Sequence, residues 1–388
     1  MGRRAGGGHA TLGRGVSRSV RDLRVLIVHD WIVAWGGAER VVEQLLVLFP
    51  DAHLVVGVLA VDKREFNNVT RRAEETWMAR MPLARTHHRW FLPLYPAAFA
   101  SIDTLGYDVI ISSSSAFAKS VRPHGDTPHL CYCHTPPRYL WDLQAEYGRG
   151  GNPIGMALAV AGPLLRVIDR ASARGVTQFI ANSHHVADRI KRVYGRTAAV
   201  VYPPVSRKPL AQSPSPTRTD SLLCLGRLVP YKRVDLAIQA ANLLGQPLLV
   251  AGDGPERTRL ERMAGPTVQF LGEVTEERAG ELMETCRLML FNAEEDFGIA
   301  PVEANAHGLP VVAYGRGAAR ETMVDGESAE FFDAPTPESL AAAVQRALGR
   351  DWDDARIRAN GTRFSPERFR RDLAAAVAQL LEDHDPAP

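Results

Sequence analysis

Short runs of branched apolar residues alternate with helical patterns along most of the chain. In the first half, 24–30 (RVLIVHD) and 53–59 (HLVVGVL) have the composition of buried strands, and 38–49 between them has the pattern of a helix. Further strands are predicted at 107–112, 128–133, 177–182 and 198–203. Such alternation predicts parallel sheets that are covered by helices on both faces.

The alternation is interrupted once and then restarts. The segment 203–220 (PPVSRKPLAQSPSPTRTD) is crowded with Pro and Ser, which is typical of a linker. Beyond it, strands are predicted at 221–226, 247–252, 268–272, 288–292 and 310–315, and a long amphipathic helix at the end of the chain. Because one hydrophobic core rarely grows beyond about 250–300 residues, a chain of 388 residues is expected to form two domains.

We therefore expect two Rossmann-like, doubly wound α/β domains that face a central cleft. Their expected bounds are 23–204 and 220–365, with a linker at 205–219. A disordered tail is expected at 1–22, and a helix at 366–388 is expected to pack back on the first domain. Ligands bind beyond the carboxyl ends of parallel strands, so both binding edges should border the cleft.

Composition excludes several classes of protein. Hydrophobic residues make up 45% of the chain and charged residues 23%, which excludes disorder as the main state. The net charge of +2 is too balanced to indicate nucleic acid as a partner. No stretch is long and apolar enough to cross a bilayer, and the first twenty residues lack the apolar core of a signal peptide, so a cytoplasmic protein is expected.

The four cysteines show no metal-ligand spacing, and we interpret them as buried, reduced thiols. They are Cys131, Cys133, Cys224 and Cys286. Cys131 and Cys133 are expected to lie on opposite faces of one strand.

The first motif that indicates chemistry is GRLVPYKR (226–233), directly after a predicted strand. Arg227 and Lys232 are positive charges beside a glycine that allows close backbone approach. A departing diphosphate needs its growing charge neutralised, either by a divalent metal ion or by side chains. A guanidinium fork and an ammonium group suit the second option. For this motif alone, a solvated basic loop is an equal alternative.

The second motif is EDFGIAPVE (295–303), which follows a predicted strand and opens a helix. Glu295 precedes the helix and Glu303 lies within it. The helix N-terminus would direct backbone N–H groups at a ligand, and paired carboxylates accept hydrogen bonds from the hydroxyl groups of ribose and hexose. The alternative is a helix capped by acidic residues. The preceding strand and the adjacent Phe-Gly pair favour a binding site.

Together these motifs resemble those of the retaining glycosyltransferases of family 4. The resemblance also rests on AGDGPE (251–256), FLGEV (270–274) and GLPVVAYGRGAARETMVDG (308–326), in the same order and spacing. It covers the second domain and, more loosely, the first. It implies the GT-B fold and an active site without a metal ion. Within the family, ISSSSAFAKS (111–120) and YCHTPPRYLWD (132–142) resemble bacterial mannosyltransferases of O-antigen or exopolysaccharide synthesis.

The resemblance implies roles for single residues. Arg227 and Lys232 match the basic pair that contacts the donor diphosphate. Glu303 matches the acid that binds the nucleotide ribose, and Glu295 matches the acid near the transferred hexose. His134 matches the histidine that faces the transferred sugar, and its place after a strand and before two prolines also puts it at the cleft edge.

Two backbone segments are also implied to contact the donor. One lies beside the acid near the hexose and comprises Phe297, Gly298 and Ile299. The other is the glycine loop near the phosphates and acceptor, formed by Gly36 and Gly37. The chain departs from the family at 317–318, where Gly317 and Ala318 stand in place of a Gly-Gly pair.

Several residues have weaker assignments. Lys119 and Arg138 are expected to contact acceptor or phosphate, with surface salt bridging as an equal alternative. The basic and aromatic segment 85–91 (RTHHRWF) fits contact with anionic lipid, although a solvated surface is slightly preferred. We reject the DxD-like triplet at 351–353 as a metal site because it lies away from any strand end. GRGAAR (315–320) lacks the third glycine of a dinucleotide fingerprint.

The sequence thus predicts a metal-independent hexosyltransferase without a cofactor. By resemblance alone, the donor is GDP-mannose and the acceptor is a glycan or a lipid-linked saccharide at the cytoplasmic face of the membrane. Two alternatives stay open. A nucleotide-sugar-binding module without catalysis would not need the complete set of two acids and two basic residues. A nicotinamide-dependent oxidoreductase would need a GxGxxG after the first strand, which this chain lacks.

Overall fold

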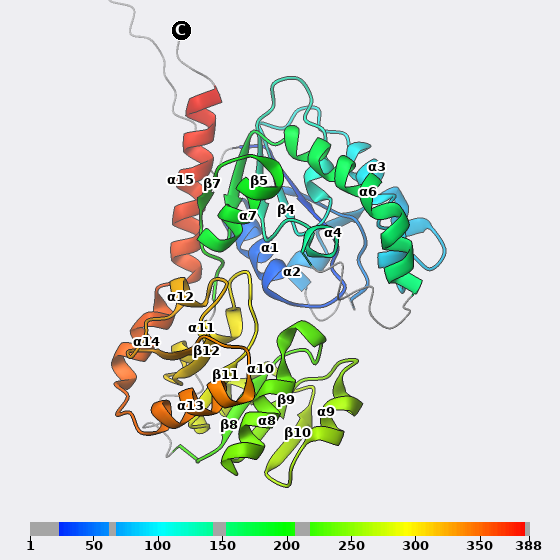
Figure 1. The fold of residues 1–388 in the computed structure, drawn as a ribbon. Coiled ribbons are helices and arrows are strands. Elements are labelled where there is room, and N and C mark those ends of the chain that lie inside the picture. Colours follow the sequence, from blue (N-terminus) through cyan, green and yellow to red (C-terminus); the bar gives the residue numbers. More distant parts are fainter. Residues whose placement is uncertain (1–22, 62–66, 143–152, 206–217, 385–388) are drawn as a thin grey trace, which may run out of the picture.

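The computed structural model describes residues 23–61, 67–142, 153–205 and 218–384. These residues form two α/β domains, one above the other in Figure 1, and each is built on a single parallel sheet. The two sheets confirm the predicted doubly wound architecture. The tail expected at 1–22 and most of the expected linker, 206–217, lie outside the described residues.

The sheet of the first domain has seven strands in the order β3-β2-β1-β4-β5-β6-β7. All neighbouring strands are parallel, and Val25 at the start of β1 pairs with Val109 at the start of β4. The strands are β1 (Val25–His29), β2 (His53–Val56), β3 (Ala73–Glu75), β4 (Val109–Ser114), β5 (His129–Cys133), β6 (Gln178–Ala181) and β7 (Ala198–Val200).

The sheet of the second domain has six parallel strands in the order β10-β9-β8-β11-β12-β13. In both sheets the order reverses beside the first strand, between β1 and β4 and between β8 and β11. Such switch points open a crevice at the carboxyl ends of the strands. The strands are β8 (Leu222–Leu225), β9 (Leu248–Ala251), β10 (Val268–Gly272), β11 (Leu288–Phe291), β12 (Val311–Tyr314) and β13 (Ala329–Phe332).

Helices cover both faces of each sheet (Figure 1). Those of the first domain are α1 (Gly37–Leu48), α2 (Asn67–Thr70), α3 (Tyr95–Ala100), α4 (Arg138–Trp141), α6 (Pro153–Arg174) and α7 (His184–Tyr194). Those that follow are α8 (Val234–Leu244), α9 (Arg257–Met263), α10 (Glu276–Thr285), α11 (Ile299–Ala306), α12 (Ala319–Thr322), α13 (Pro337–Leu348), α14 (Asp354–Thr362) and α15 (Pro366–His384). Short 3-10 turns are η2 (Trp77–Arg80), η3 (His88–Phe91), η4 (Ala118–Ser120) and η5 (Pro230–Lys232).

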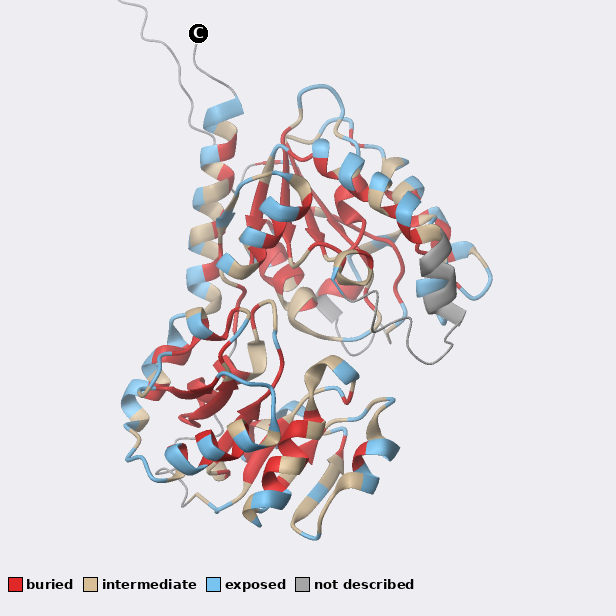
Figure 2. Ribbon diagram, in the orientation of Figure 1, coloured by how far each residue is buried: buried red, intermediate tan, exposed pale blue. Residues whose placement is uncertain are grey.

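The inner strands are buried on both faces, as Figure 2 shows, because each sheet has a core on either side. In β1, Val25 and Ile27 face one core while Leu26 and Val28 face the other. In β8, Leu222 and Leu223 divide in the same way. This two-sided burial is why the predicted strands appear in the sequence as continuous apolar runs.

The last helix, α15, belongs to the first domain by packing although it follows the second in the chain. It runs along the side of the upper domain in Figure 1 and contacts α1. Its apolar stripe is buried in the same core as β1 and consists of Phe369, Leu373, Val377 and Leu380. The Phe369 ring meets the Tyr132 ring of β5 edge to face at 5.7 Å. The spacing of 3 and 4 residues in this stripe is what an amphipathic helix requires.

Other details differ from the expectations or extend them. Cys131 and Cys133 pack into the same core, so the expectation of opposite faces was wrong: residues two apart in a strand point to the same face. All four cysteines are buried and free.

Helix α6 continues through Pro163 to Arg174. Among the described residues, no helix combines the length and apolar character needed to cross a bilayer.

Candidate active site between the domains

A cavity of about 420 Å³ lies between the domains, beyond the carboxyl ends of both sheets. Both domains contribute to its wall. Of the residues that the resemblance assigns to the donor and the reaction, all but Arg227 line it, namely Gly36, Gly37, His134, Lys232, Glu295, Phe297, Gly298, Ile299 and Glu303. Residues up to 267 positions apart in the chain are therefore brought to one site. No sequence pattern defines this cavity, but the strand-end rule predicts its place.

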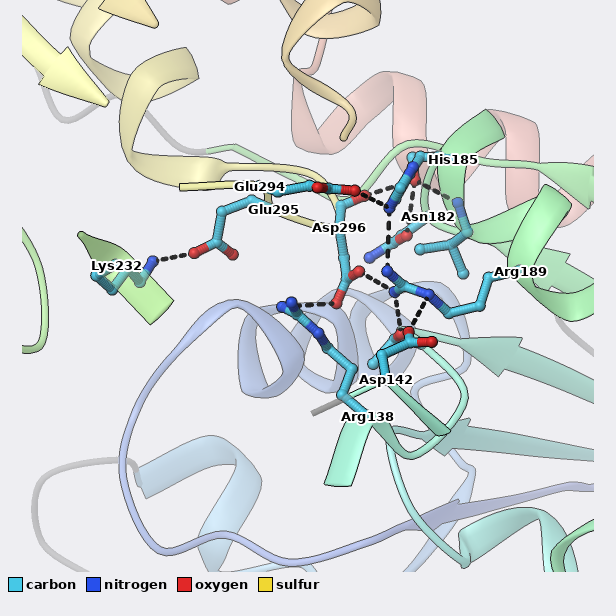
Figure 3. Close-up of polar contacts among 12 residues, drawn as sticks. Arg138, Asp142, Asn182, His185, Arg189, Lys232, Glu294, Glu295 and Asp296 are labelled. Carbon is cyan, nitrogen blue, oxygen red and sulfur yellow. Dashed lines mark hydrogen bonds and ion pairs between the residues drawn. The ribbon is translucent and has the colours of Figure 1, made fainter. Parts of the chain in front are cut away.

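Lys232 and Glu295 form an ion pair at the edge of this cavity. Lys232 ends η5 after β8, and its Nζ lies 2.5 Å from Glu295 Oε1 (Figure 3). Burial disfavours the ammonium charge, yet the Glu295 carboxylate raises the pKa of Lys232 above its usual value. The lysine is therefore held charged at the wall of the cavity.

The second acid, Glu303, lies on α11 and pairs with the other domain. Gly298 begins this helix with a φ of +83°, a conformation that favours glycine. Ile299 and Ala300 in its first turn line the cavity, so the N-terminal end of the helix borders it. Glu303 forms a short ion pair with Arg40 of α1. Burial raises the pKa of Glu303, and Arg40 opposes that shift.

A second cavity, of about 490 Å³, adjoins the first. Arg40 and Glu303 line both, so their ion pair stands between the two spaces. Arg40 also contacts Glu276 of α10, with Nη2 and Oε1 3.1 Å apart. Trp35 and Met283 add apolar surface to the second cavity. A flat ring system has room there, and Glu303 at the junction is placed to accept hydrogen bonds from hydroxyl groups.

His134 follows β5, and its ring contacts a series of buried polar side chains of the first domain. Its Nε2 lies 2.8 Å from Ser113 Oγ, which lies 3.1 Å from His29 Nδ1. Glu39 Oε1 is 3.8 Å from the other nitrogen of His29. Burial and, to a smaller extent, His29 together lower the pKa of His134 to about 3. His134 is therefore neutral at physiological pH, and the chain of contacts fixes its ring at the cavity wall.

Gly37 faces Ile299 of the other domain. A methyl group on its Cα would clash with Cδ1 of Ile299 across the cleft. Its φ is not the reason for glycine here, because the residue begins α1 in ordinary helical conformation. A side chain at position 37 would require the Ile299 side chain to turn away.

A cluster of charged residues from both domains holds the loop beside Glu295 (Figure 3), and of its members the sequence analysis singled out only Arg138. Arg189 of α7 forms a short ion pair with Asp296, and Arg138 Nη1 lies 3.8 Å from the other oxygen of that carboxylate. The Ser183 hydroxyl donates a 2.5 Å hydrogen bond to the Asp296 carbonyl oxygen. Arg189 and Asp296 are 107 positions apart. Asp296 lies within the EDFGIAPVE motif, but no motif includes Arg189.

The structure corrects one predicted contact and leaves another unplaced. Lys119 is 1% exposed, and its Nζ lies 2.6 Å from Asp169, which is fully buried. Assigning Lys119 to the acceptor was therefore wrong, because its charge is neutralised inside the first domain. Arg227 is exposed on the loop after β8 and lines neither cavity. Arg138 lies at the interface, with its guanidinium 5.3 Å from the centre of the Tyr231 ring.

The rejected DxD-like triplet has a structural role. Asp353 caps α14, with its carboxylate accepting hydrogen bonds from the backbone N–H groups of Ala355 and Arg356. Within the described parts of the chain, no group of three or more His, Cys, Asp or Glu side chains is arranged to hold a metal ion.

Two family descriptions match the chain, one for each half. Residues 35–208 match "Glycosyltransferase Family 4", and residues 206–364 match "Glycosyl transferases group 1". Together they span both domains and meet in the expected linker.

Two curated relatives share 30% identity with parts of the chain. One is the GDP-mannose-dependent alpha-(1-6)-phosphatidylinositol monomannoside mannosyltransferase of Mycolicibacterium smegmatis, matched over 41% of this chain and 47% of the relative. The other is the D-inositol 3-phosphate glycosyltransferase of Geodermatophilus obscurus, matched over 42% of this chain and 41% of the relative. The chain thus spans less than half the length of either relative.

Among solved structures, HepE of Anabaena in complex with UDP and glucose is similar over 92% of this chain and 99% of its own. The TM-score is 0.65 at 19% sequence identity. That similarity concerns the fold, which is GT-B.

Proposed function

This chain belongs to glycosyltransferase family 4, and we propose that it transfers a hexose from a nucleotide-diphosphate sugar to an acceptor hydroxyl group. One observation carries the proposal. The cavity between the domains has a half-buried ammonium group, two carboxylates and a helix N-terminus on one side, and a neutral histidine on the other. A diphosphate, a ribose and a hexose each need one of these groups.

Each residue has a place in this proposal. The diphosphate lies beside Lys232 and the first turn of α11, where positive charge is concentrated. The ribose hydroxyl groups bind Glu303 in place of Arg40, and the base enters the second cavity. The hexose lies between Glu295 and His134. Arg227 reaches the diphosphate only if its loop moves, because its side chain is exposed outside the cavity.

The proposed reaction proceeds with retention at the anomeric carbon. The bond from the sugar to the phosphate oxygen breaks first, and Lys232 with the α11 N-terminus stabilises the charge that develops on the leaving diphosphate. The acceptor hydroxyl attacks from the same face and gives its proton to a phosphate oxygen of the leaving group. No protein nucleophile is required. The charge stabilisation comes from side chains and backbone, so we propose a reaction that needs no metal ion.

The proposed donor is GDP-mannose. Support comes from the relative named above, whose printed name specifies that donor. The rival is a UDP-sugar, because HepE of similar fold is in complex with UDP. A panel of GDP- and UDP-sugars, with release of nucleoside diphosphate as the readout, tests the proposal. GDP-mannose should give the fastest release with an acceptor present. A chain that binds donor but releases no diphosphate with any acceptor tested would be a binding module.

Independence from metal is tested separately. Turnover should be the same in excess EDTA as in magnesium or manganese. Activity that disappears with EDTA and returns with one of these ions would refute the metal-free part of the proposal while leaving sugar transfer intact.

The proposal extends to peripheral contact with a membrane that carries the lipid-linked acceptor. In the segment 83–91, Leu83 and Trp90 are 58% and 60% exposed, next to exposed Arg85 and Arg89. Apolar and basic side chains together favour anionic bilayer surfaces. The full chain should co-sediment with vesicles rich in phosphatidylglycerol but not with phosphatidylcholine vesicles. Trp90→Ala should weaken that binding. If the parent and Trp90→Ala bound the vesicles equally, the segment 83–91 would not be the membrane-contacting surface.

A further inference from the structure

The loop that carries Glu295 is held in place by the opposite domain. Residues 294–296 follow β11 and lead directly into the segment 297–299 that lines the cavity. Within the second domain, the Glu295 carbonyl accepts a hydrogen bond from Ala318 N at 3.0 Å. The next residue, Asp296, points the other way: its side chain and its carbonyl are both bound by residues of the first domain.

Arg189 is the main partner in this contact, and most of its bonds stay within its own domain. Its side chain is 5% exposed. Nη1 donates to Thr135 Oγ1 at 2.7 Å, and Nε lies 2.7 Å from Asp142 Oδ2. Nη2 lies 3.1 Å from His185 Nε2. Figure 3 shows the guanidinium between Asp142 on one side and Asp296 on the other. Separating the domains would remove only the bond to Asp296.

The charges make this contact selective for the closed arrangement. Arg138 and Arg189 bring two positive charges to the Asp296 carboxylate, while Asp142 supplies one negative charge within the first domain. With the domains apart, Arg189 would keep its partner in Asp142, but Asp296 would lose both arginines and its carbonyl would lose Ser183. The loop beside Glu295 would then be anchored from one side only.

We propose that Asp296 and Arg189 form an interdomain clasp that places Glu295 for the hexose only when the domains are closed. Arg189 and Asp296 are thus positioning residues, which act through the loop and do not touch the substrate. The role of Glu295 in this inference rests on the proposed function. Because the loop is complete only in the closed state, the clasp would also limit loss of the donor to water in the open state.

The test compares two isosteric variants of the carboxylates that flank Arg189. Asp296→Asn removes the interdomain charge, and Asp142→Asn is the matched control that removes the intradomain charge. For Asp296→Asn, kcat should fall about tenfold or more, because a smaller share of the enzyme closes. The KM for the donor should change less than about threefold, since the diphosphate and ribose contacts lie on other residues. Asp142→Asn should stay within about threefold of the parent in kcat.

Closure is measured directly in the same variants. Spin labels at Arg122→Cys and Arg262→Cys, exposed positions in the two domains, report the interdomain distance, and the native cysteines are buried. With GDP bound, the parent and Asp142→Asn should show one short distance, and Asp296→Asn a broader, longer distribution. Unchanged distances and kcat in Asp296→Asn, or equal losses in both variants, would overturn the clasp. If no donor supports turnover by the parent, the proposed function fails, and the distances still decide whether the clasp exists.

Discussion

At the scale of single residues, Lys232 and Glu295 illustrate how a site for an anion can be kept charged inside a protein. Each carries a charge that burial disfavours, and at 2.5 Å each stabilises the other. A diphosphate arriving at this pair would take over the contact with the ammonium group. Glu303 and Arg40 repeat the arrangement at the neighbouring cavity. The site is thus lined by ion pairs that a donor would exchange for its own polar groups.

Replacement of Lys232 by alanine should cost about two to three orders of magnitude in kcat, because one preorganised group that stabilises the leaving charge is lost. The fold should be unchanged by circular dichroism. Arg262→Ala, which removes an exposed cation of the same domain, is the control and should keep parent activity. Parent-like turnover of Lys232→Ala would show that the lysine does not stabilise the leaving group.

The lowered pKa of His134, about 3, predicts a pH-dependent contribution to stability. In the unfolded chain this histidine binds a proton below its usual pKa of about 6.5, whereas in the folded protein it stays neutral. As pH falls from 6.5 toward 3, His134 therefore destabilises the fold progressively. Since its ring partly faces the cavity, we expect about 1–2 kcal/mol between pH 6.5 and 4.5.

Chemical denaturation of the parent and of His134→Gln at several pH values measures this effect. The variant should lose less unfolding free energy than the parent on acidification. Parallel losses in the two proteins would mean that His134 is protonated in the folded state at its ordinary pKa.

At the scale of elements, the sequence predicts most strands from their apolar runs but misses β3 and β13. β1 and β8 appear as apolar runs because both their faces meet a core. β3 (Ala73–Glu75) contains two glutamates at the edge of its sheet, and β13 (Ala329–Phe332) is four residues long after a turn. Neither has a pattern that separates it from a loop, so only their pairing with neighbours defines them as strands.

The start of α1 provides a prediction about the fit between elements. Gly37→Ala should lower kcat by about threefold to tenfold, because the added methyl group meets Cδ1 of Ile299 and turns this side chain within the cavity that it lines. The first domain itself should not lose stability, since alanine favours a helix more than glycine does.

Ile299→Val is the compensating change, because valine lacks the Cδ1 atom that the new methyl group would strike. The double variant Gly37→Ala with Ile299→Val should recover most of the lost kcat. A double variant no better than Gly37→Ala alone would mean that the glycine is required for another reason, such as direct contact with the substrate.

Helix α15 should be a structural part of the first domain. Phe369→Ala removes a buried ring that contacts Tyr132 and should cost about 3–5 kcal/mol of unfolding free energy. Glu382→Ala, an exposed position on the same helix, should be neutral. Calorimetry would resolve the two domains. A lower Tm confined to the transition of the second domain would contradict this assignment of α15.

At the scale of the whole molecule, the sequence predicts the cleft but not the contacts across it. Strand order and the motifs place Lys232, Glu295 and His134 at the facing edges of two sheets. The pairs Arg40–Glu303 and Arg189–Asp296 join residues 263 and 107 positions apart and depend on how the domains meet. Lys119 was assigned wrongly for a different reason: its buried partner, Asp169, lies in the same domain but distant in the sequence.

The central claim is that the cavity between the domains binds a nucleoside diphosphate by its cationic and acidic side chains. A crystal structure of the chain with GDP tests it most directly. The account predicts the diphosphate in hydrogen-bonding contact with Lys232 and the first turn of α11, and the ribose hydroxyl groups on Glu303 with Arg40 displaced. A diphosphate bound away from Lys232, with the Arg40–Glu303 pair still intact, would contradict it.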